Sequence, residues 1–265
     1  MAMITPQNHS SDSKTPIFLY IALWCLVWLH VLRGVITLLI LFPFIGTSSK
    51  KHHIQRWSRR LLSIFGVELQ VNAEDVIPNT SFLLVSNHVS WMDIHAINSF
   101  TPIRFVAKSE VAKWPVFGWM AKQLGTIFIR RDSSRNARQV VIDMAAILKT
   151  QAICIFPEGT STIGKSVEVF KPNLFESAVL AEVPVCTLAL AYFDQESGQH
   201  SEVPAFIGDM GLIGSMASIL KNRRLRVELT FFSPIEARSG LPLERKDLAL
   251  YSQEQIALYL KNYCN

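Results

Sequence analysis

The chain has 265 residues, of which 49% are hydrophobic, and a formal net charge of +5. This length suits one sizeable α/β domain with an appendage and excludes two large domains. The charge indicates an anionic partner, but no recognised nucleic-acid-binding signature accompanies it, so nucleic acid is not an expected partner. The four cysteines have no paired short spacing, which argues against a zinc site or a disulfide framework and is consistent with a reducing, cytosol-facing compartment.

The N-terminal region divides into a polar leader and a long apolar run. We expect residues 1–16 to be disordered and residues 17–46 to anchor the chain in a membrane. A secretory signal would have a shorter apolar region ending at a small-residue cleavage site, whereas Pro43 and Phe44 lead here into a basic segment. The sequence therefore predicts an anchor that is retained.

The length of the apolar run argues against one straight span. At about 1.5 Å per residue it would be roughly 40 Å long, against a hydrocarbon core of about 30 Å. Arg33 would then lie near the membrane centre, which is costly. Two shorter helices over residues 17–32 and 35–45, with a break at Arg33 and Gly34, avoid this cost. They would lie in one leaflet or cross as a tight hairpin, and a single tilted span is the alternative.

A basic cluster follows the apolar run directly. It contains Lys50, Lys51, Arg56, Arg59 and Arg60, with His52 and His53 between them. By the positive-inside rule this flank lies on the cytoplasmic side. Because anionic headgroups are its natural counterions, we expect contact with an anionic membrane surface.

Strand and helix signals alternate through the main predicted domain, residues 47–265. A helix is expected over residues 55–65, ending at Gly66, which is a usual C-terminal helix signal. Strands are expected over residues 67–71, 81–85, 104–107, 126–129, 152–156, 185–192 and 225–232, and further helices over 133–149 and 244–263. This alternation favours an α/β fold with a mixed, mostly buried sheet covered by helices.

His88 and Asp93 lie where the second predicted strand ends and a helix begins. At this spacing a turn can bring the carboxylate to one ring nitrogen of the histidine and leave the other nitrogen free as a general base. The chain has no G-x-S-x-G nucleophile elbow, so the attacking hydroxyl can belong to the substrate. The histidine would then deprotonate an acceptor alcohol as it attacks an acyl thioester, and backbone N–H groups at the helix start would stabilise the oxyanion.

Two other interpretations of this segment stay open on its residues alone. Ser90 and Asp93 have the form of a helix N-cap pair, and His88 can be a hydrogen-bonded residue at a strand end. A metal site formed by His88, Asp93 and His95 is a third interpretation, but the spacing matches no common ligand pattern.

A second cluster, Phe156-Pro157-Glu158-Gly159-Thr160, follows another predicted strand about seventy residues later. Together with Asn87-His88-x4-Asp93, it strongly resembles the glycerolipid acyltransferase family, typified by bacterial 1-acyl-glycerol-3-phosphate acyltransferases. The resemblance runs from about residue 50 to residue 240 and includes the order and spacing of weaker blocks. It implies the family's α/β fold and a pair of membrane-seating helices, so residues 47–265 would be the catalytic domain.

The resemblance also implies roles for individual residues. His88 would be the general base and Asp93 its partner. The acceptor site would contain Lys108, Arg130, Glu158, Gly159, Thr160 and Ser161. On the residues alone, Arg130 can equally be a solvated surface charge, and Glu158 can cap the next helix.

Ser161 departs from the commonest family pattern, in which Arg follows Thr160. Some family members with a serine there resemble the branch that acylates lyso-ornithine lipid, whose zwitterionic head lacks a phosphate. Because a guanidinium matches phosphate geometry, its loss weakens the expected phosphate recognition. Lyso-ornithine lipid is therefore the alternative acceptor.

These features predict a membrane-bound O-acyltransferase. It would transfer a fatty acyl group from acyl-CoA or acyl-carrier protein to 1-acyl-glycerol-3-phosphate, giving phosphatidic acid, with no metal or bound cofactor. A thioesterase or lipid hydrolase that uses water is the alternative of another class, and the presence of His88 and Asp93 argues against a non-catalytic scaffold. The family and the charge bias imply a bacterial inner membrane with the catalytic domain facing the cytoplasm.

Overall fold

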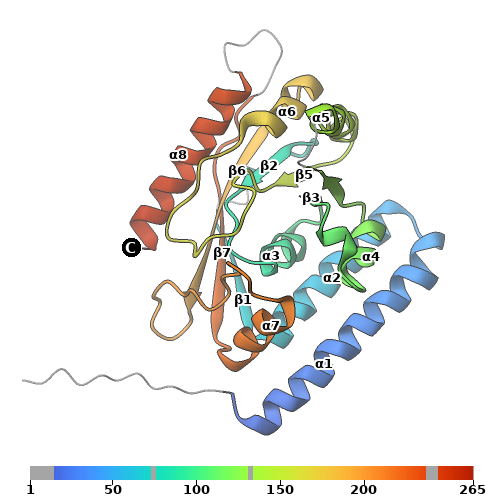
Figure 1. Cartoon of the computed structure of the whole chain (residues 1–265), viewed down its shortest axis with the longest axis vertical. Coiled ribbons are helices and arrows are strands. Elements are labelled where there is room, and N and C mark those ends of the chain that lie inside the picture. The colour runs from blue at the N-terminus through green and yellow to red at the C-terminus, as the bar shows by residue number, and fades with distance from the viewer. Residues whose placement is uncertain (1–14, 73–75, 131–133, 237–243, 265) are drawn as a thin grey trace, which may run out of the picture.

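The computed structural model describes residues 15–72, 76–130, 134–236 and 244–264. Its centre is a sheet with the strand order β1-β7-β6-β2-β5-β3-β4 (Figure 1). The strands are β1 (Val67–Asn72), β2 (Leu83–Ser86), β3 (Arg104–Lys108), β4 (Ile127–Ile129), β5 (Ile153–Ile155), β6 (Val185–Asp194) and β7 (Leu225–Phe231). Neighbouring strands are parallel except β6 and β7, which pair antiparallel. The mixed sheet predicted from the sequence is thus confirmed.

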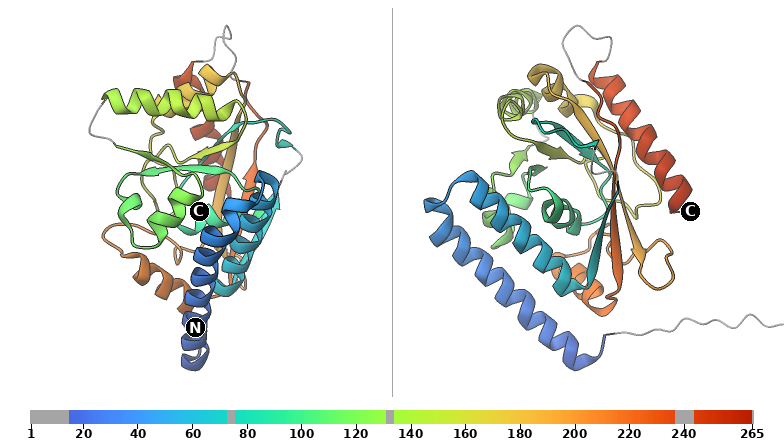
Figure 2. Two further views of the ribbon diagram at one scale, coloured as in Figure 1. Left: turned by 90° about the vertical axis from the view of Figure 1, so that its right-hand side faces the viewer. Right: turned by 180° about the vertical axis from the view of Figure 1, so that it is seen from behind.

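Helices cover both faces of this sheet (Figure 2). They are α1 (Ile17–Ile36), α2 (Thr47–Phe65), α3 (Met92–Phe100), α4 (Phe117–Gln123), α5 (Ser134–Leu148), α6 (Glu176–Ala181), α7 (Leu212–Lys221) and α8 (Arg245–Tyr263). The central strand β2 serves both layers, because Leu84 belongs to the hydrophobic cluster with α1 to α4 and α7, whereas Leu83 and Val85 belong to the cluster with α5, α6 and α8. Burial on both faces explains why this strand lacks polar alternation.

The predicted break at Arg33 and Gly34 is wrong. Helix α1 runs through both residues to Ile36 and continues as a π-helical turn, Thr37–Leu41, and a 3₁₀ turn, Phe42–Phe44. Arg33 is exposed, so its charge is not enclosed by protein. Gly34 is buried because Trp57 of α2 packs against it, and a Cβ atom there would lie 2.7 Å from the indole Nε1. The glycine therefore permits a close helix contact and does not end the helix.

The second N-terminal helix is the amphipathic α2, which begins at Thr47, well before the predicted start at residue 55. It returns beside α1 (Figure 1) and ends at Gly66, whose φ of 70° confirms the predicted stop. Trp57 of α2 and His30 of α1 link the two helices, because the side chain of each contacts the backbone carbonyl of the other. The indole Nε1 donates to the carbonyl of His30 at 3.2 Å, and the His30 Nε2 lies 3.0 Å from the carbonyl oxygen of Trp57.

The segment Ile17–Phe44 is long and apolar enough to cross a membrane and is the one such candidate among the described residues. One side of α1 packs against the rest of the chain through Leu23, Val27 and Val31. The other side exposes large apolar residues, among them Phe18 at 85% of its surface. The division into residues 17–46 and 47–265 stays a prediction, and residues 1–14 of the predicted leader lie outside the described residues.

Candidate active site

Two loops that are distant in the sequence meet at the carboxyl ends of β2 and β5. The strands pair parallel, with Val85 opposite Ile155. Continuing this register places His88 beside Glu158, because each lies three residues after its member of the Val85–Ile155 pair. The His88 backbone N–H donates to Glu158 Oε1 at 2.7 Å. The structure thus joins the two sequence clusters into one site, at the sheet edge where α/β enzymes place their chemistry.

His88 is oriented by Asp93. The ring Nδ1 lies 2.7 Å from Asp93 Oδ2, the carboxylate is fully buried, and the imidazole is 22% exposed. With the Nδ1 proton donated to the carboxylate, Nε2 keeps its lone pair. The spacing prediction that these two side chains meet is confirmed by the geometry, and the arrangement suits a general base.

Four donors converge on the Asp93 carboxylate. The backbone N–H groups of Val89 and Ser90 also donate to Oδ2, at 2.8 and 2.9 Å. Oδ1 accepts a hydrogen bond from the hydroxyl of Tyr192 at 2.7 Å. Sequence reasoning missed Tyr192, which lies within β6 and is fully buried. Its only signal was a phenolic hydroxyl in a mostly apolar strand.

Asn87 secures the loop from the other side. Its Nδ2 donates to the Leu190 carbonyl, and its Oδ1 accepts from the Leu190 N–H, both at 2.8 Å. The side chain therefore imitates one residue of a strand and extends the β2–β6 pairing past the end of β2. This bidentate contact gives a physical reason for an asparagine directly before His88.

The imidazole of His88 stacks on Phe156, with ring centroids 4.1 Å apart and an interplanar angle of 14°. Phe156 in turn stacks on Phe105 of β3, at 6.2 Å and 20°. An aromatic face beside an imidazole stabilises the imidazolium that a general base becomes after it accepts a proton. The aromatic pair also fixes the ring plane of His88.

Glu158 is 2% exposed and tied to two backbone groups. Besides the His88 N–H, the N–H of Glu168 donates to its Oε2 at 2.8 Å. Burial raises the pKa of Glu158 to about 7, against the lowering effect of these hydrogen bonds. Because both oxygens are engaged, the geometry favours a positioning role for Glu158, and its predicted place in the acceptor site stays a prediction.

A third loop, which contains Phe206, completes the frame. Its N–H donates to the carbonyl of Val89 at 2.8 Å, while Thr162 N–H donates to the carbonyl of His88 at 2.9 Å. The Ser161 hydroxyl donates to the carbonyl of Phe206. Ser161 thus joins two loops, and an arginine at this position would have to leave that contact unmade.

Four of the expected oxyanion donors at the start of α3 are already engaged. Val89 and Ser90 donate to Asp93, and the N–H of Met92 donates to the Ser90 hydroxyl at 3.3 Å. Asp93 N–H donates to the Ser90 carbonyl at 3.1 Å. These groups shape the histidine loop and are not available to a substrate in this conformation.

The cationic members of the predicted acceptor site lie farther along the same edge. Lys108 ends β3, Arg130 follows β4, and the two strands pair with Lys108 opposite Ile129. At about 4.8 Å per strand, β3 and β4 lie roughly 10 and 14 Å from β2, within the combined reach of a long side chain and a headgroup. Lys108, Arg130 and Thr160 are exposed. Gly159, at φ 70°, closes the turn that begins at Phe156.

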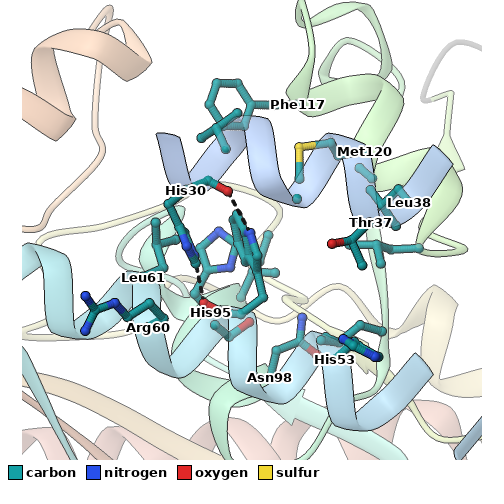
Figure 3. Close-up of a pocket in the computed structure, with 18 of the residues that line it drawn as sticks. His30, Thr37, Leu38, His53, Arg60, Leu61, His95, Asn98, Phe117 and Met120 are labelled. Atoms are coloured by element: carbon teal, nitrogen blue, oxygen red, sulfur yellow. Dashed lines mark hydrogen bonds between the residues drawn. The ribbon is translucent and has the colours of Figure 1, made fainter. Parts of the chain in front are cut away.

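A cavity of about 890 Å³ lies between the N-terminal helices and the sheet (Figure 3). It is lined by residues of α1, α2, α3, α4, β3 and α7, most of them apolar. Phe105 and Trp91 form part of its wall. Phe105 stacks on Phe156, and Phe156 stacks on His88. The cavity wall is therefore connected to the imidazole through two stacked aromatic rings.

His95 belongs to this cavity and not to the catalytic pair. It lies among Trp57 and Trp91, with ring centroids 5.3 and 5.8 Å away, and its buried Nδ1 has no hydrogen-bond partner among the described residues. Burial lowers the pKa of His95 to about 3, so the ring is neutral near pH 7. Among the described residues no group of three or more His, Cys, Asp or Glu side chains could hold a metal ion.

Comparison with known proteins identifies the family. The Acyltransferase family model matches residues 68–191. A lyso-ornithine lipid O-acyltransferase of Pseudomonas aeruginosa is 35% identical over 77% of this chain and 76% of its own length. A 1-acyl-sn-glycerol-3-phosphate acyltransferase of Neisseria meningitidis is 31% identical over 71% of this chain and 74% of its own length.

A solved structure agrees with the fold. The crystal structure of the 1-acyl-sn-glycerophosphate acyltransferase PlsC of Thermotoga maritima superposes with a TM-score of 0.67, covering 93% of this chain and 95% of that one, at 22% identity. The family model covers the stretch that contains both the His88 loop and the Glu158 loop. The chain therefore belongs to the acyltransferase family and is an acyltransferase.

Proposed function

We propose that this acyltransferase esterifies the free hydroxyl of a lysolipid with a fatty acyl group from acyl-CoA or acyl-carrier protein, at the membrane surface. The observation that carries the proposal is the His88–Asp93 pair, whose imidazole has no hydrogen bond to a serine, threonine or cysteine side chain among the described residues. The hydroxyl is then supplied by the acceptor. The named activities of the relatives from Pseudomonas and Neisseria support a lysolipid acceptor.

The proposed reaction is a direct transfer. His88 Nε2 takes the proton of the acceptor hydroxyl while the oxygen of that hydroxyl attacks the carbonyl carbon of the thioester. The tetrahedral intermediate collapses by breaking the C–S bond, and the imidazolium returns the proton to the leaving thiolate. Asp93 stabilises the imidazolium that exists between the two proton transfers. Because Asp93 is held by four donors, it keeps the same ring tautomer throughout.

The cavity beside Phe105 is the proposed site of an acyl chain. Its volume of about 890 Å³ lies within the usual range of roughly 300–1,000 Å³ for ligand pockets. Its wall is mostly apolar, and it approaches His88 through the stacked Phe105 and Phe156. A chain that lies there would place its carbonyl end toward the imidazole.

We favour 1-acyl-glycerol-3-phosphate as the acceptor. Lys108 and Arg130 end neighbouring strands on the same edge as His88, so a phosphate can approach them while the hydroxyl of the same molecule lies at the imidazole. Charge-assisted hydrogen bonds of this kind are worth roughly 1.5–3 kcal/mol each. The Neisseria relative is named for this acceptor.

Lyso-ornithine lipid is the second proposed acceptor. Ser161 places a small hydroxyl where many family members carry arginine, and this hydroxyl contacts the Phe206 loop. The Pseudomonas relative, which covers slightly more of the chain, is named for the zwitterionic acceptor. Lys108 and Arg130 thus favour the phosphate-bearing lipid, and Ser161 favours the zwitterionic one.

Helix α1 is the proposed membrane anchor. One of its sides packs along the catalytic domain, so the exposed apolar side is oriented away from the protein, toward lipid. This arrangement supports seating in one leaflet, with the basic residues of α2 near anionic headgroups. The proposed location is the bacterial inner membrane, with the catalytic domain on the cytoplasmic side.

The test is acyl transfer by the full chain in vesicles, with a labelled acyl thioester and either lysolipid. We expect ester product from a lysolipid, a higher kcat/KM for lysophosphatidate, and a specific loss of that preference in Arg130→Ala. Ser161→Arg tests the second acceptor. A shift of preference from lyso-ornithine lipid toward lysophosphatidate would show that residue 161 determines which head group is accepted. Release of free fatty acid without ester from either lipid would instead identify a thioesterase.

A further inference from the structure

One face of α3 lines the cavity. The residues of this face are Trp91, Ile94, His95 and Asn98, and they have the spacing of a single helical stripe. A face that bounds a mostly apolar space is expected to be apolar itself. His95 and Asn98 instead bring an imidazole and a carboxamide to the wall (Figure 3). Two polar side chains therefore face the space proposed for the acyl chain.

The polar groups that surround His95 already have partners within the protein. The indole N–H of Trp57 donates to the carbonyl of His30 at 3.2 Å. The indole N–H of Trp91 donates to the hydroxyl oxygen of Ser215 at 3.0 Å. His95 contacts both indoles, but its ring nitrogens form no hydrogen bond among the described residues. Because the ring is only partly buried and Nδ1 is its buried nitrogen, Nε2 is the one that a molecule in the cavity can reach.

The partner that His95 lacks is an uncharged group. Burial lowers the pKa of His95 to about 3, so the ring carries no charge near pH 7 and does not attract a phosphate or a carboxylate. Cationic residues of the wall, among them Arg33, Arg56 and Arg60, are exposed instead. Charged parts of a ligand would therefore meet the arginines, and a neutral polar group would meet His95.

Asn98 supplies a second hydrogen-bonding group on the same face. Its Oδ1 accepts from the N–H of Ile103 at 3.2 Å, and its Nδ2 forms no hydrogen bond among the described residues. Nδ2 can only donate, whereas a neutral imidazole nitrogen presents either an N–H or a lone pair, according to the tautomer. A hydroxyl both donates and accepts, so it can pair with Nδ2 and with either tautomer of His95. A carbonyl oxygen only accepts and cannot pair with an imidazole lone pair.

We propose that His95 and Asn98 form a polar subsite that selects acyl chains bearing a hydroxyl group. The hydroxyl accepts a hydrogen bond from Asn98 Nδ2 and pairs with His95 Nε2, and the rest of the chain contacts the apolar wall. An unsubstituted chain leaves both groups without a partner, and a site built to bind a hydroxyl discriminates against an analogue that lacks it. The inference rests on the proposed function, because it takes the cavity to hold the acyl chain of the donor.

Binding is measured separately from catalysis, as displacement of a fluorescent fatty acid from the full chain in detergent. The competitors are palmitate and a series of hydroxypalmitates that differ only in the carbon that carries the hydroxyl. We expect one position in the series to bind about tenfold more tightly than palmitate, because only there does the hydroxyl reach the subsite. If no hydroxypalmitate binds more tightly than palmitate, the inference is wrong.

His95→Phe keeps an aromatic ring and removes both ring nitrogens. We expect this variant to bind palmitate at least as tightly as the wild type does and to lose most of the tenfold preference. His95→Gln, which keeps a donor and an acceptor, should retain part of it. His53→Phe makes the same change at another histidine of the cavity wall and is the matched control, with the preference unchanged (Figure 3). A full preference in folded His95→Phe would overturn the inference, and if that variant does not fold, the wild-type comparison decides.

Acyl transfer tests the subsite during turnover. For the wild type, kcat/KM with the best hydroxypalmitoyl thioester should exceed kcat/KM with the palmitoyl thioester about tenfold, and the ratio should fall toward one in His95→Phe. Ester formation at equal kcat/KM from both thioesters would contradict the subsite and leave the proposed function standing. Tight binding of the hydroxylated chain without any ester product would contradict the proposed function and leave the subsite standing.

Discussion

The catalytic loops leave no carboxylate oxygen of Asp93 or Glu158 without a donor, whereas the neighbouring cavity retains a buried, unpaired nitrogen on His95. The loops are fixed by hydrogen bonds to each other, to Leu190 and Tyr192 within β6 and to the Phe206 loop, and the cavity is formed by helices that meet mainly through apolar contacts. An unpaired buried nitrogen costs about 1–3 kcal/mol. The comparison teaches that the loops of the proposed proton transfer are held by a complete set of hydrogen bonds, whereas the proposed acyl-chain cavity leaves a buried polar atom without a partner among the described residues.

The largest expected effect is the loss of the base. General-base assistance contributes about 10²–10⁴-fold, so His88→Ala should reduce kcat by that order without unfolding the chain. The measurement is ester formation with circular dichroism as the fold check, and His52→Ala, an exposed histidine of α2, is the control. Asp93→Asn is a less clean variant, because its amide would face the N–H groups of Val89 and Ser90. Normal turnover by folded His88→Ala would contradict the mechanism.

The protonation of Glu158 allows the hydrogen-bonded loops to be tested by the pH dependence of stability. Its folded-state pKa of about 7 is above the ordinary 4.5, so the folded chain holds this proton more tightly than the unfolded chain. Raising the pH from 4.5 to 7 should therefore lower the free energy of unfolding, by on the order of 3 kcal/mol from this group.

Glu158→Gln should remove this part of the pH dependence, while Glu168→Gln, which changes an exposed side chain in the same loop, should keep it. Urea unfolding in detergent at pH 5 and pH 8 measures the difference. If the free energy of unfolding changes equally between pH 5 and pH 8 in both variants, the pKa of Glu158 is not raised.

Tyr192→Phe removes one of the four donors to Asp93. We expect kcat to fall about tenfold, equivalent to about 1.4 kcal/mol in the activation barrier, with KM for both substrates unchanged. Tyr259→Phe is the matched control, because that hydroxyl donates to Glu228 at 3.2 Å away from the site. A stability loss without a change in kcat would make Tyr192 a packing residue only.

The smallest expected effect concerns the cavity. Gly34→Ala would push Trp57 away from α1, since the new Cβ would lie 2.7 Å from the indole nitrogen and 3.0 Å from Met120. We expect a several-fold loss of kcat/KM for the longest acyl chains and little change for short ones. Gly46→Ala, with nothing within 4 Å of the added atom, is the control. If kcat/KM depends on acyl-chain length in the same way in both variants, the contact of α1 with α2 at Gly34 does not limit the acyl chain.

Much of the sheet and the catalytic pair could be predicted from the sequence, because they depend on local signals. Apolar runs and the alternation of apolar with polar residues located the strands, and a five-residue spacing between a strand and a helix sufficed to pair His88 with Asp93. Tyr192 could not be predicted, since its contact with Asp93 requires β6 to lie beside β2, and strand order is not written in local periodicity. The shared register of β2 and β5, which joins His88 to Glu158, has the same origin.

The N-terminal helix shows where local reasoning failed. The predicted break rested on the length of the apolar run and on the cost of placing Arg33 near the membrane centre. In the structure the helix continues through both residues, and Gly34 meets Trp57 of α2. The cavity was invisible for the same reason, because it exists only when α1 and α2 fold back on the sheet.

The most direct test of direct acyl transfer is thiol release from an acyl thioester by the wild-type chain, measured with and without lysolipid. The account predicts that release depends on the acceptor and matches ester formation mole for mole. Release that continues at the same rate without lysolipid, or acyl label bound covalently to the protein, would contradict it.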